Sequence, residues 1–114
     1  MKKVALIVAG GKGERMNADI PKQFLLLNNL PILMHTIKQF SHFEEIVLVL
    51  PKSQFDYWNG LCKNNNFTQI HILVEGGETR FHSVKNGLDK IDNTSVVAIH
   101  DGVRPLISTA LINN

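Results

Sequence analysis

Glycines and basic residues gather in three short segments of this sequence, 9–16, 76–80 and 100–105, and each segment follows an apolar run. Five of the twelve Lys and Arg residues lie in or just past them: Lys12, Arg15, Lys22, Arg80 and Arg104. Glycine lets backbone amides approach an anion closely, and cations neutralise its charge. The combination predicts a site for a phosphate-containing ligand.

The first glycine segment differs from the common phosphate-binding loops. A dinucleotide fingerprint requires glycine where Met16 stands, and a Walker A loop requires a lysine followed by serine or threonine where Glu14 and Arg15 stand. A purely structural turn is therefore the alternative for this segment.

Arg15 and Lys22 are candidates for transition-state stabilisation. Two cations on phosphate oxygens would stabilise the charge that develops during phosphoryl or nucleotidyl transfer. One such contact at about 4 Å contributes on the order of 4 kcal/mol in a partly desolvated site. The alternative for either residue alone is a solvated loop cation.

Asp101 is the candidate metal ligand. It follows an apolar run and precedes Gly102, as expected of a carboxylate that holds Mg²⁺ against phosphates. Capping a turn is the alternative role for Asp101.

The five histidines lack the paired spacing of zinc sites. No Asp/His arrangement near Ser83 in sequence supports a nucleophile, so nucleotide contact or helix hydrogen bonding is expected of its hydroxyl.

The segments are positioned by strands and helices that are predicted to alternate along the chain. Four β-branched apolar runs predict buried strands at 4–8, 46–50, 70–74 and 96–99. Helices are predicted over 32–40 after Pro31, from Ser53 with Asp56 as a capping box, and over 81–91 with apolar positions 81, 84, 88 and 91 on one face. The alternation predicts an α/β fold with a mainly parallel sheet in a Rossmann-like three-layer α/β/α arrangement.

Composition limits the class of protein. The 114 residues suffice for one domain, and the net charge of +2 gives no basic excess for nucleic-acid or membrane-surface binding. No apolar run reaches membrane-spanning length. Cys62 is the only cysteine, which fits a reducing cytoplasm. A helix capped by Ser108 would run only six residues to Asn114, so we expect the remainder of a larger domain to be absent.

Four motifs in order resemble the 2-C-methyl-D-erythritol 4-phosphate cytidylyltransferases of the non-mevalonate isoprenoid pathway. The similar segments cover nearly the whole chain: Ala9–Met16 leading to Pro21–Leu25, then His35–Thr36, Gly76–Leu88 and His100–Pro105. The resemblance implies a nucleotidyltransferase-type fold that uses CTP and Mg²⁺.

By this resemblance each candidate residue has an expected role. Arg15 and Lys22 would stabilise the α-phosphate during catalysis, and Asp101 would bind Mg²⁺. The expected CTP-binding residues are Ala9, Gly10, Gly11, Gly13, Arg15, Lys22, Gly77, Glu78, Arg80, Ser83, Asp101 and Gly102. The reaction would join CMP to a small sugar-alcohol phosphate and release pyrophosphate, without a covalent intermediate or a general base.

Length is the main departure from the family. Its proteins are about twice as long, and their second half supplies another metal carboxylate, most residues for the sugar phosphate, and the arm of a homodimer. Residues 1–114 are therefore expected to be the nucleotide-binding portion of one truncated nucleotidyltransferase domain. The alternatives are ribitol-5-phosphate cytidylyltransferase, which has the same CTP loops, and a non-catalytic CTP-binding fragment.

Overall fold

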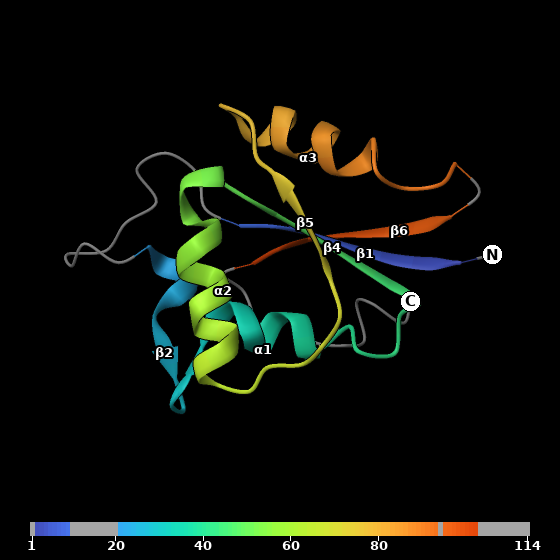
Figure 1. Cartoon of the computed structure of the whole chain (residues 1–114). Coiled ribbons are helices and arrows are strands. Elements are labelled where there is room, and N and C mark those ends of the chain that lie inside the picture. The colour runs from blue at the N-terminus through green and yellow to red at the C-terminus, as the bar shows by residue number, and fades with distance from the viewer. Residues whose placement is uncertain (1, 10–20, 94, 103–114) are drawn as a thin grey trace.

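A four-stranded parallel sheet forms the centre of the molecule (Figure 1). The computed structural model describes residues 2–9, 21–93 and 95–102. The strands are β1 (Lys3–Val8), β4 (Glu45–Leu50), β5 (Ile72–Glu75) and β6 (Val96–Asp101), in the order β5-β4-β1-β6. All four predicted strands and their parallel direction are confirmed. Only the third begins later than expected, because the segment before Ile72 is not part of the sheet and leaves Ile70 85% exposed.

Helices cover both faces of this sheet, so the predicted three-layer α/β arrangement is confirmed. Helices α1 (Ile32–Lys38) and α2 (Phe55–Asn64) lie on one face, and α3 (Arg80–Leu88) lies on the other (Figure 1). Residues 4–7 of β1 are fully buried because alternate side chains enter the two layers. None of the helices in the described residues is long and apolar enough to cross a bilayer.

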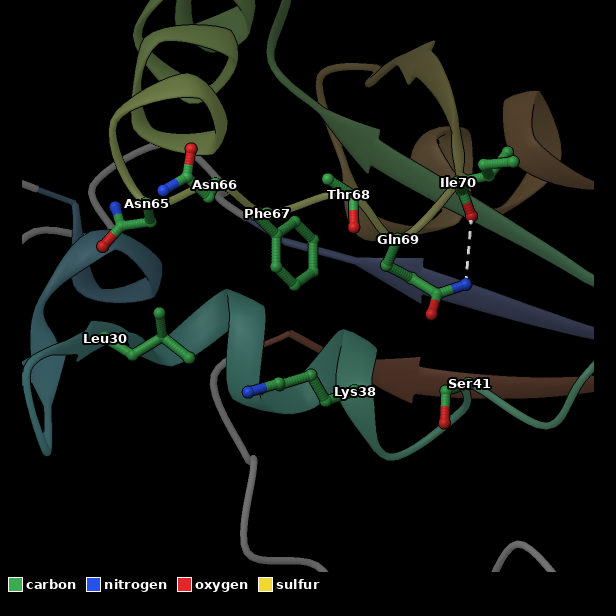
Figure 2. A pocket seen from close by; sticks show the side chains of 9 residues that line it. All are labelled: Leu30, Lys38, Ser41, Asn65, Asn66, Phe67, Thr68, Gln69 and Ile70. Carbon is green, nitrogen blue, oxygen red and sulfur yellow. Dashed lines mark hydrogen bonds between the residues drawn. The ribbon is translucent and has the colours of Figure 1, made fainter.

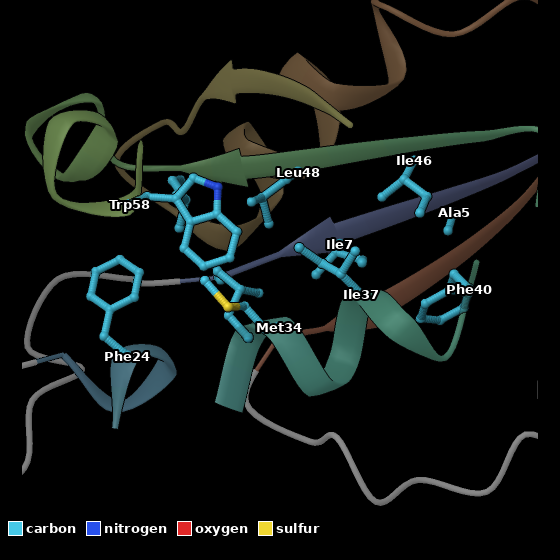
Figure 3. Packing of buried hydrophobic residues seen from close by; sticks show 12 residues of the cluster. Ala5, Ile7, Phe24, Met34, Ile37, Phe40, Ile46, Leu48 and Trp58 are labelled. Carbon is cyan, nitrogen blue, oxygen red and sulfur yellow. The ribbon is translucent and has the colours of Figure 1, made fainter. Parts of the chain in front are cut away.

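The larger core lies between the sheet and the α1–α2 layer (Figure 3). Trp58 of α2, Met34 of α1 and Phe40 just after α1 are fully buried in it, and Phe24 stacks near Trp58 with ring centroids 6.1 Å apart. Phe24 belongs to the short 3₁₀ helix η1 (Lys22–Phe24). Burial of Phe24 therefore anchors the segment that carries Lys22.

A β-hairpin that was not predicted from the sequence follows η1. Strands β2 (Leu26–Leu27) and β3 (Leu30–Pro31) are antiparallel, and the turn residues Asn28 and Asn29 have φ values of 53° and 67°. Asparagine tolerates this left-handed region better than most residues, and two such residues in succession suit a tight hairpin. Apolar periodicity misses the hairpin because its strands have only two residues each.

The predicted capping box at Ser53 and Asp56 is wrong. Ser53 lies inside a second 3₁₀ helix, η2 (Lys52–Gln54), and α2 begins at Phe55 without a side-chain cap. Pro51 presets its own φ near −57°, and the chain then winds directly from η2 into α2. The residue before α2, Gln54, is already in the helical region, so no extended capping residue is present.

The predicted buried face of the third helix is also partly wrong. Phe81 is 72% exposed and Leu88 is 40% exposed, whereas Ser83 and Gly87 are buried. Helix α3 approaches the sheet through Gly87, where an added Cβ would lie 2.4 Å from Leu6 Cδ1. Of the four predicted apolar positions, Val84 and Ile91 do pack against the sheet. The helix expected from Ser108 lies outside the described residues.

Candidate functional site

Three loops leave the carboxyl edge of the sheet in a similar way. Ala9, Gly76 and Gly102 each follow a strand and donate a backbone hydrogen bond to the neighbouring strand, at 3.0, 2.8 and 3.0 Å respectively. These bonds extend the sheet by one residue beyond its last regular pairs. The structure therefore brings the starts of all three glycine-containing segments to one edge, where ligands of parallel α/β sheets bind.

Gly77 and Ser83 form a rigid connection between β5 and α3. The Gly77 amide donates to Ser83 Oγ at 3.0 Å, and a Cβ at Gly77 would lie 2.3 Å from His82 Cβ. Thr79 caps α3 by accepting a hydrogen bond from the His82 amide at 3.1 Å. The loop is thus held against the first turn of α3, and Ser83 makes a loop hydrogen bond rather than serving in a nucleophile arrangement.

Glu78 and Arg80 are exposed at the beginning of α3. Three strand spacings separate β5 from β6, a distance of about 14 Å across the edge. Because β5 and β6 are the outer strands of the sheet, the loop that leaves β5 and Asp101 at the end of β6 start from opposite ends of the edge, which suits an extended ligand lying across the strand ends.

Asp101 ends β6 directly beside Val8 of β1. The next residue, Gly102, is buried, and a Cβ at that position would lie 2.7 Å from Ala9 Cβ. Glycine is needed here because the β1 and β6 loops touch. The end of β6 and the residue after β1, which are distant in sequence, are therefore packed directly against each other.

Lys22 is attached to the same edge through its neighbour. Gln23 is fully buried, and its Nε2 donates to Oε1 of Gln54 at 2.7 Å. Gln54 belongs to η2, which follows the carboxyl end of β4. No motif or periodicity connects two glutamines 31 residues apart, so the sequence alone does not predict this contact. Lys22 itself is half-buried at the start of η1.

Part of the predicted site lies outside the described residues. This applies to Gly10, Gly11, Gly13 and the second catalytic candidate, Arg15. Their predicted roles stay predictions.

Metal binding at this edge depends on donor chemistry. Among the described residues, no three or more His, Cys, Asp or Glu side chains are grouped to hold a metal ion. Asp101 supplies one hard carboxylate oxygen donor. Mg²⁺ commonly binds through one or two carboxylates together with substrate phosphates, so this donor fits Mg²⁺ held jointly with a triphosphate.

A groove of about 630 Å³ lies on a different part of the molecule, between α1 and the segment after α2 (Figure 2). Lys38 is the one charged residue among its lining residues, which are Leu30, Lys38, Ser41, Asn65, Asn66, Phe67, Thr68, Gln69 and Ile70. None of the predicted site residues lines it. The groove has no carboxylate and no glycine loop, so it does not have the chemistry expected for a magnesium triphosphate.

Cys62 is predicted to react slowly with alkylating agents. Burial against the α1–α2 core raises the pKa of its thiol from 9.0 to about 11, so the reactive thiolate is reduced about a hundredfold at neutral pH. Iodoacetamide alkylation followed by mass spectrometry should be at least tens of times slower in the native protein than in urea, an order-of-magnitude expectation from the thiolate fraction. Equal rates in both states would contradict this environment.

Comparison with known proteins assigns this arrangement to a family. The profile of the 2-C-methyl-D-erythritol 4-phosphate cytidylyltransferase family matches residues 3–114. A curated relative of that name from Porphyromonas gingivalis is 55% identical over 113 residues, covering 98% of this chain and 51% of the relative. The chain belongs to the 2-C-methyl-D-erythritol 4-phosphate cytidylyltransferase family.

Two further members show how much of the family's length is present. The Bacteroides fragilis protein is 52% identical over 115 residues, covering 98% of this chain and 52% of its own length. The crystal structure of the Francisella tularensis cytidylyltransferase superposes with a TM-score of 0.75 at 34% identity, covering 99% of this chain and 49% of that one. The chain thus spans about half the length of the family members that it matches.

Proposed function

We propose that this chain is the nucleotide-binding portion of a cytidylyltransferase that transfers CMP from CTP to 2-C-methyl-D-erythritol 4-phosphate and releases pyrophosphate. The observation that carries the proposal is the meeting of Ala9, Gly77 and the Asp101–Gly102 pair at one carboxyl edge, in a chain that belongs to this family. The acceptor is inferred from the family name.

Binding of CTP would use the backbone of the first glycine segment and the β5–α3 loop. Gly10, Gly11 and Gly13 would offer amides to the phosphates. Ala9, whose own amide donates to the Val49 carbonyl, would lie beside them as a backbone contact. Across the edge, the cytosine and ribose would be contacted by Gly77, Arg80 and Ser83. Glu78 and Gly102 would lie next to the nucleotide. These contacts are supported by the β5–α3 loop, where the Gly77 amide donates to Ser83 Oγ and leaves the Ser83 hydroxyl proton for a nucleotide acceptor.

Asp101 would hold Mg²⁺ together with the triphosphate. When bound, the ion would neutralise charge on the phosphate oxygens. The Asp101 carboxylate supplies one donor for it, and the remaining ligands would be phosphate oxygens and water.

Lys22 and Arg15 would stabilise the transition state. The acceptor's phosphate oxygen attacks the α-phosphorus of CTP, a new P–O bond forms, and the bond to pyrophosphate breaks. The acceptor phosphate is already an anionic nucleophile, so no general base is required. The two cations would neutralise the charge that grows on the α-phosphoryl oxygens.

Partners and location follow from the same proposal. We infer a homodimer for the full-length protein, because the family resemblance implies a dimerisation arm in the second half. A cytoplasmic location is supported by the single cysteine and by two water-soluble phosphorylated substrates.

Nucleotide preference provides a direct test of the site. With Mg²⁺ present, calorimetry should show that CTP binds at least about tenfold more tightly than ATP, because a base-specific pocket rejects the larger purine. Equal binding of the two nucleotides, or no binding to a folded protein, would contradict the proposal.

Acceptor choice is tested separately with the full-length protein. Pyrophosphate release should be faster with 2-C-methyl-D-erythritol 4-phosphate than with ribitol 5-phosphate. A clear preference for ribitol 5-phosphate would retain the cytidylyltransferase mechanism but overturn the acceptor.

A further inference from the structure

Thr36 has a polar contact that the proposed function does not use. It lies in the middle of α1 and is fully buried. Its Oγ1 donates to the backbone carbonyl of Gly102 at 3.0 Å, while the carbonyl of Ile32 in its own helix is 3.4 Å away. A hydroxyl carries one proton, and the shorter distance assigns it to Gly102.

This hydroxyl is costly unless it is hydrogen-bonded. Burying an unpaired hydroxyl is unfavourable because its hydrogen bond to water is lost, whereas valine has a similar shape and no polar atom to desolvate. Within α1, the neighbouring buried positions Leu33, Met34 and Ile37 are all apolar. A threonine at position 36 is therefore explained by its bond to a residue 66 positions away rather than by core packing.

Both polar backbone groups of Gly102 are hydrogen-bonded, and its Cα lies against neighbouring residues. Its amide donates to the Val8 carbonyl at 3.0 Å, and its carbonyl accepts from Thr36. A Cβ on Gly102 would meet Ala9 at 2.7 Å and Leu33 at 3.0 Å. The residue after Asp101 is thus enclosed between β1 and α1, with both polar backbone atoms paired.

The same helix layer supports the residue before Asp101. His100 is buried, and its ring packs against Phe40, just after α1, with centroids 5.2 Å apart. Asp101 is therefore flanked by two residues that the α1 layer holds in place. On the carboxyl-terminal side of Asp101, the Thr36 bond holds the Gly102 carbonyl, in addition to the bond between the Gly102 amide and Val8.

We propose that Thr36 is a positioning residue, which orients the Asp101 carboxylate for Mg²⁺ by holding the Gly102 carbonyl. This inference rests on the proposed function, because it assumes that Asp101 meets the metal. Thr36 is fully buried, so it would act without contacting the nucleotide or the metal. Its contribution is to remove alternative backbone orientations of the β6 end before the ligand binds.

Three variants separate positioning from general stability. Thr36→Val removes the hydroxyl and retains the shape, and Thr36→Ser retains the hydroxyl. Ile37→Val is the matched control, because Ile37 is also fully buried in α1 and the change only removes one methylene. Each variant is first checked for cooperative unfolding.

The first measurement is amide hydrogen exchange of the ligand-free protein. In Thr36→Val, the Gly102 amide should exchange about tenfold faster relative to the Val49 amide in β4, consistent with loss of one hydrogen bond. Thr36→Ser and Ile37→Val should leave this ratio unchanged. An unchanged ratio in Thr36→Val would overturn the proposal, whether or not the protein binds CTP.

The second measurement is the Mg²⁺ concentration that half-saturates CTP binding. Thr36→Val should raise it at least about fivefold, with less effect on CTP affinity in EDTA, and Thr36→Ser should restore it. An equal shift in Ile37→Val, or none in Thr36→Val, would overturn the metal-positioning role. If the unmodified protein showed no Mg²⁺-dependent CTP binding, the metal-positioning role would be refuted together with the proposed function. The hydrogen-exchange result would still show whether the Thr36 bond restrains the backbone at Gly102.

Discussion

Replacing Lys22 with alanine in the full-length protein is expected to lower the turnover number at least about a hundredfold. The proposed mechanism needs positive charge beside the α-phosphate as it becomes five-coordinate. A cation about 4 Å from that charge contributes on the order of 4 kcal/mol in a partly desolvated site, which is enough for this effect. Pyrophosphate release at saturating substrates measures the change.

Lys52 provides the matched control for this experiment. Like Lys22, it is the first residue of a 3₁₀ helix and follows a proline, but it is exposed on η2. Lys52→Ala should leave turnover within about twofold of the unmodified protein, because an exposed cation is screened by water. Near-normal turnover in Lys22→Ala would refute the catalytic role, and an equal loss in both variants would indicate a nonspecific charge effect.

Replacing Gly77 with alanine is expected to weaken CTP binding at least about tenfold, which corresponds to about 1.4 kcal/mol. The new methyl group would lie 2.3 Å from His82 Cβ, an atom attached directly to the α3 backbone, so no side-chain rotation relieves the overlap. The loop must move away from α3, and the Gly77 amide then loses the Ser83 hydroxyl. Calorimetry with CTP and Mg²⁺ measures the loss.

Gly60→Ala is the matched control, because an added methyl group at Gly60 has no close neighbours. A Cβ at this α2 position meets no heavy atom within 4 Å, so Gly60→Ala should retain CTP binding and increase stability by about 0.5–1 kcal/mol. Denaturant unfolding of both variants shows whether Gly77→Ala remains folded. Unaltered CTP affinity in folded Gly77→Ala would remove this loop from the nucleotide site.

Local patterns in the sequence were sufficient for most of the fold. The β-branched run of β1 predicted a strand buried on both faces, and residues 4–7 are fully buried there. Strand–helix alternation predicted the parallel sheet and its layers. Glycine and charge at the strand ends predicted which loops share an edge, because parallel strands must all end on the same side.

Helix details were less predictable because packing overrode local signals. The apolar positions of α3 predicted that Phe81 and Leu88 are buried, yet both are exposed while Val84 packs against the sheet. Gly87 instead brings the helix backbone close to Leu6. The capping signal at Ser53 was overridden by the 3₁₀ turn that follows Pro51. In each case a contact or a proline outweighed a preference of a few tenths to about one kcal/mol.

The sequence alone therefore determined the fold class, the family resemblance and the loops that form the proposed site. Only the tertiary structure showed how those loops are held: Gln23 by Gln54, Gly77 by Ser83, and Gly102 by Thr36. The physical reason is that periodicity and turn preferences act over a few neighbouring residues. Two of these bonds join residues 31 and 66 positions apart, which become neighbours only after the layers have packed.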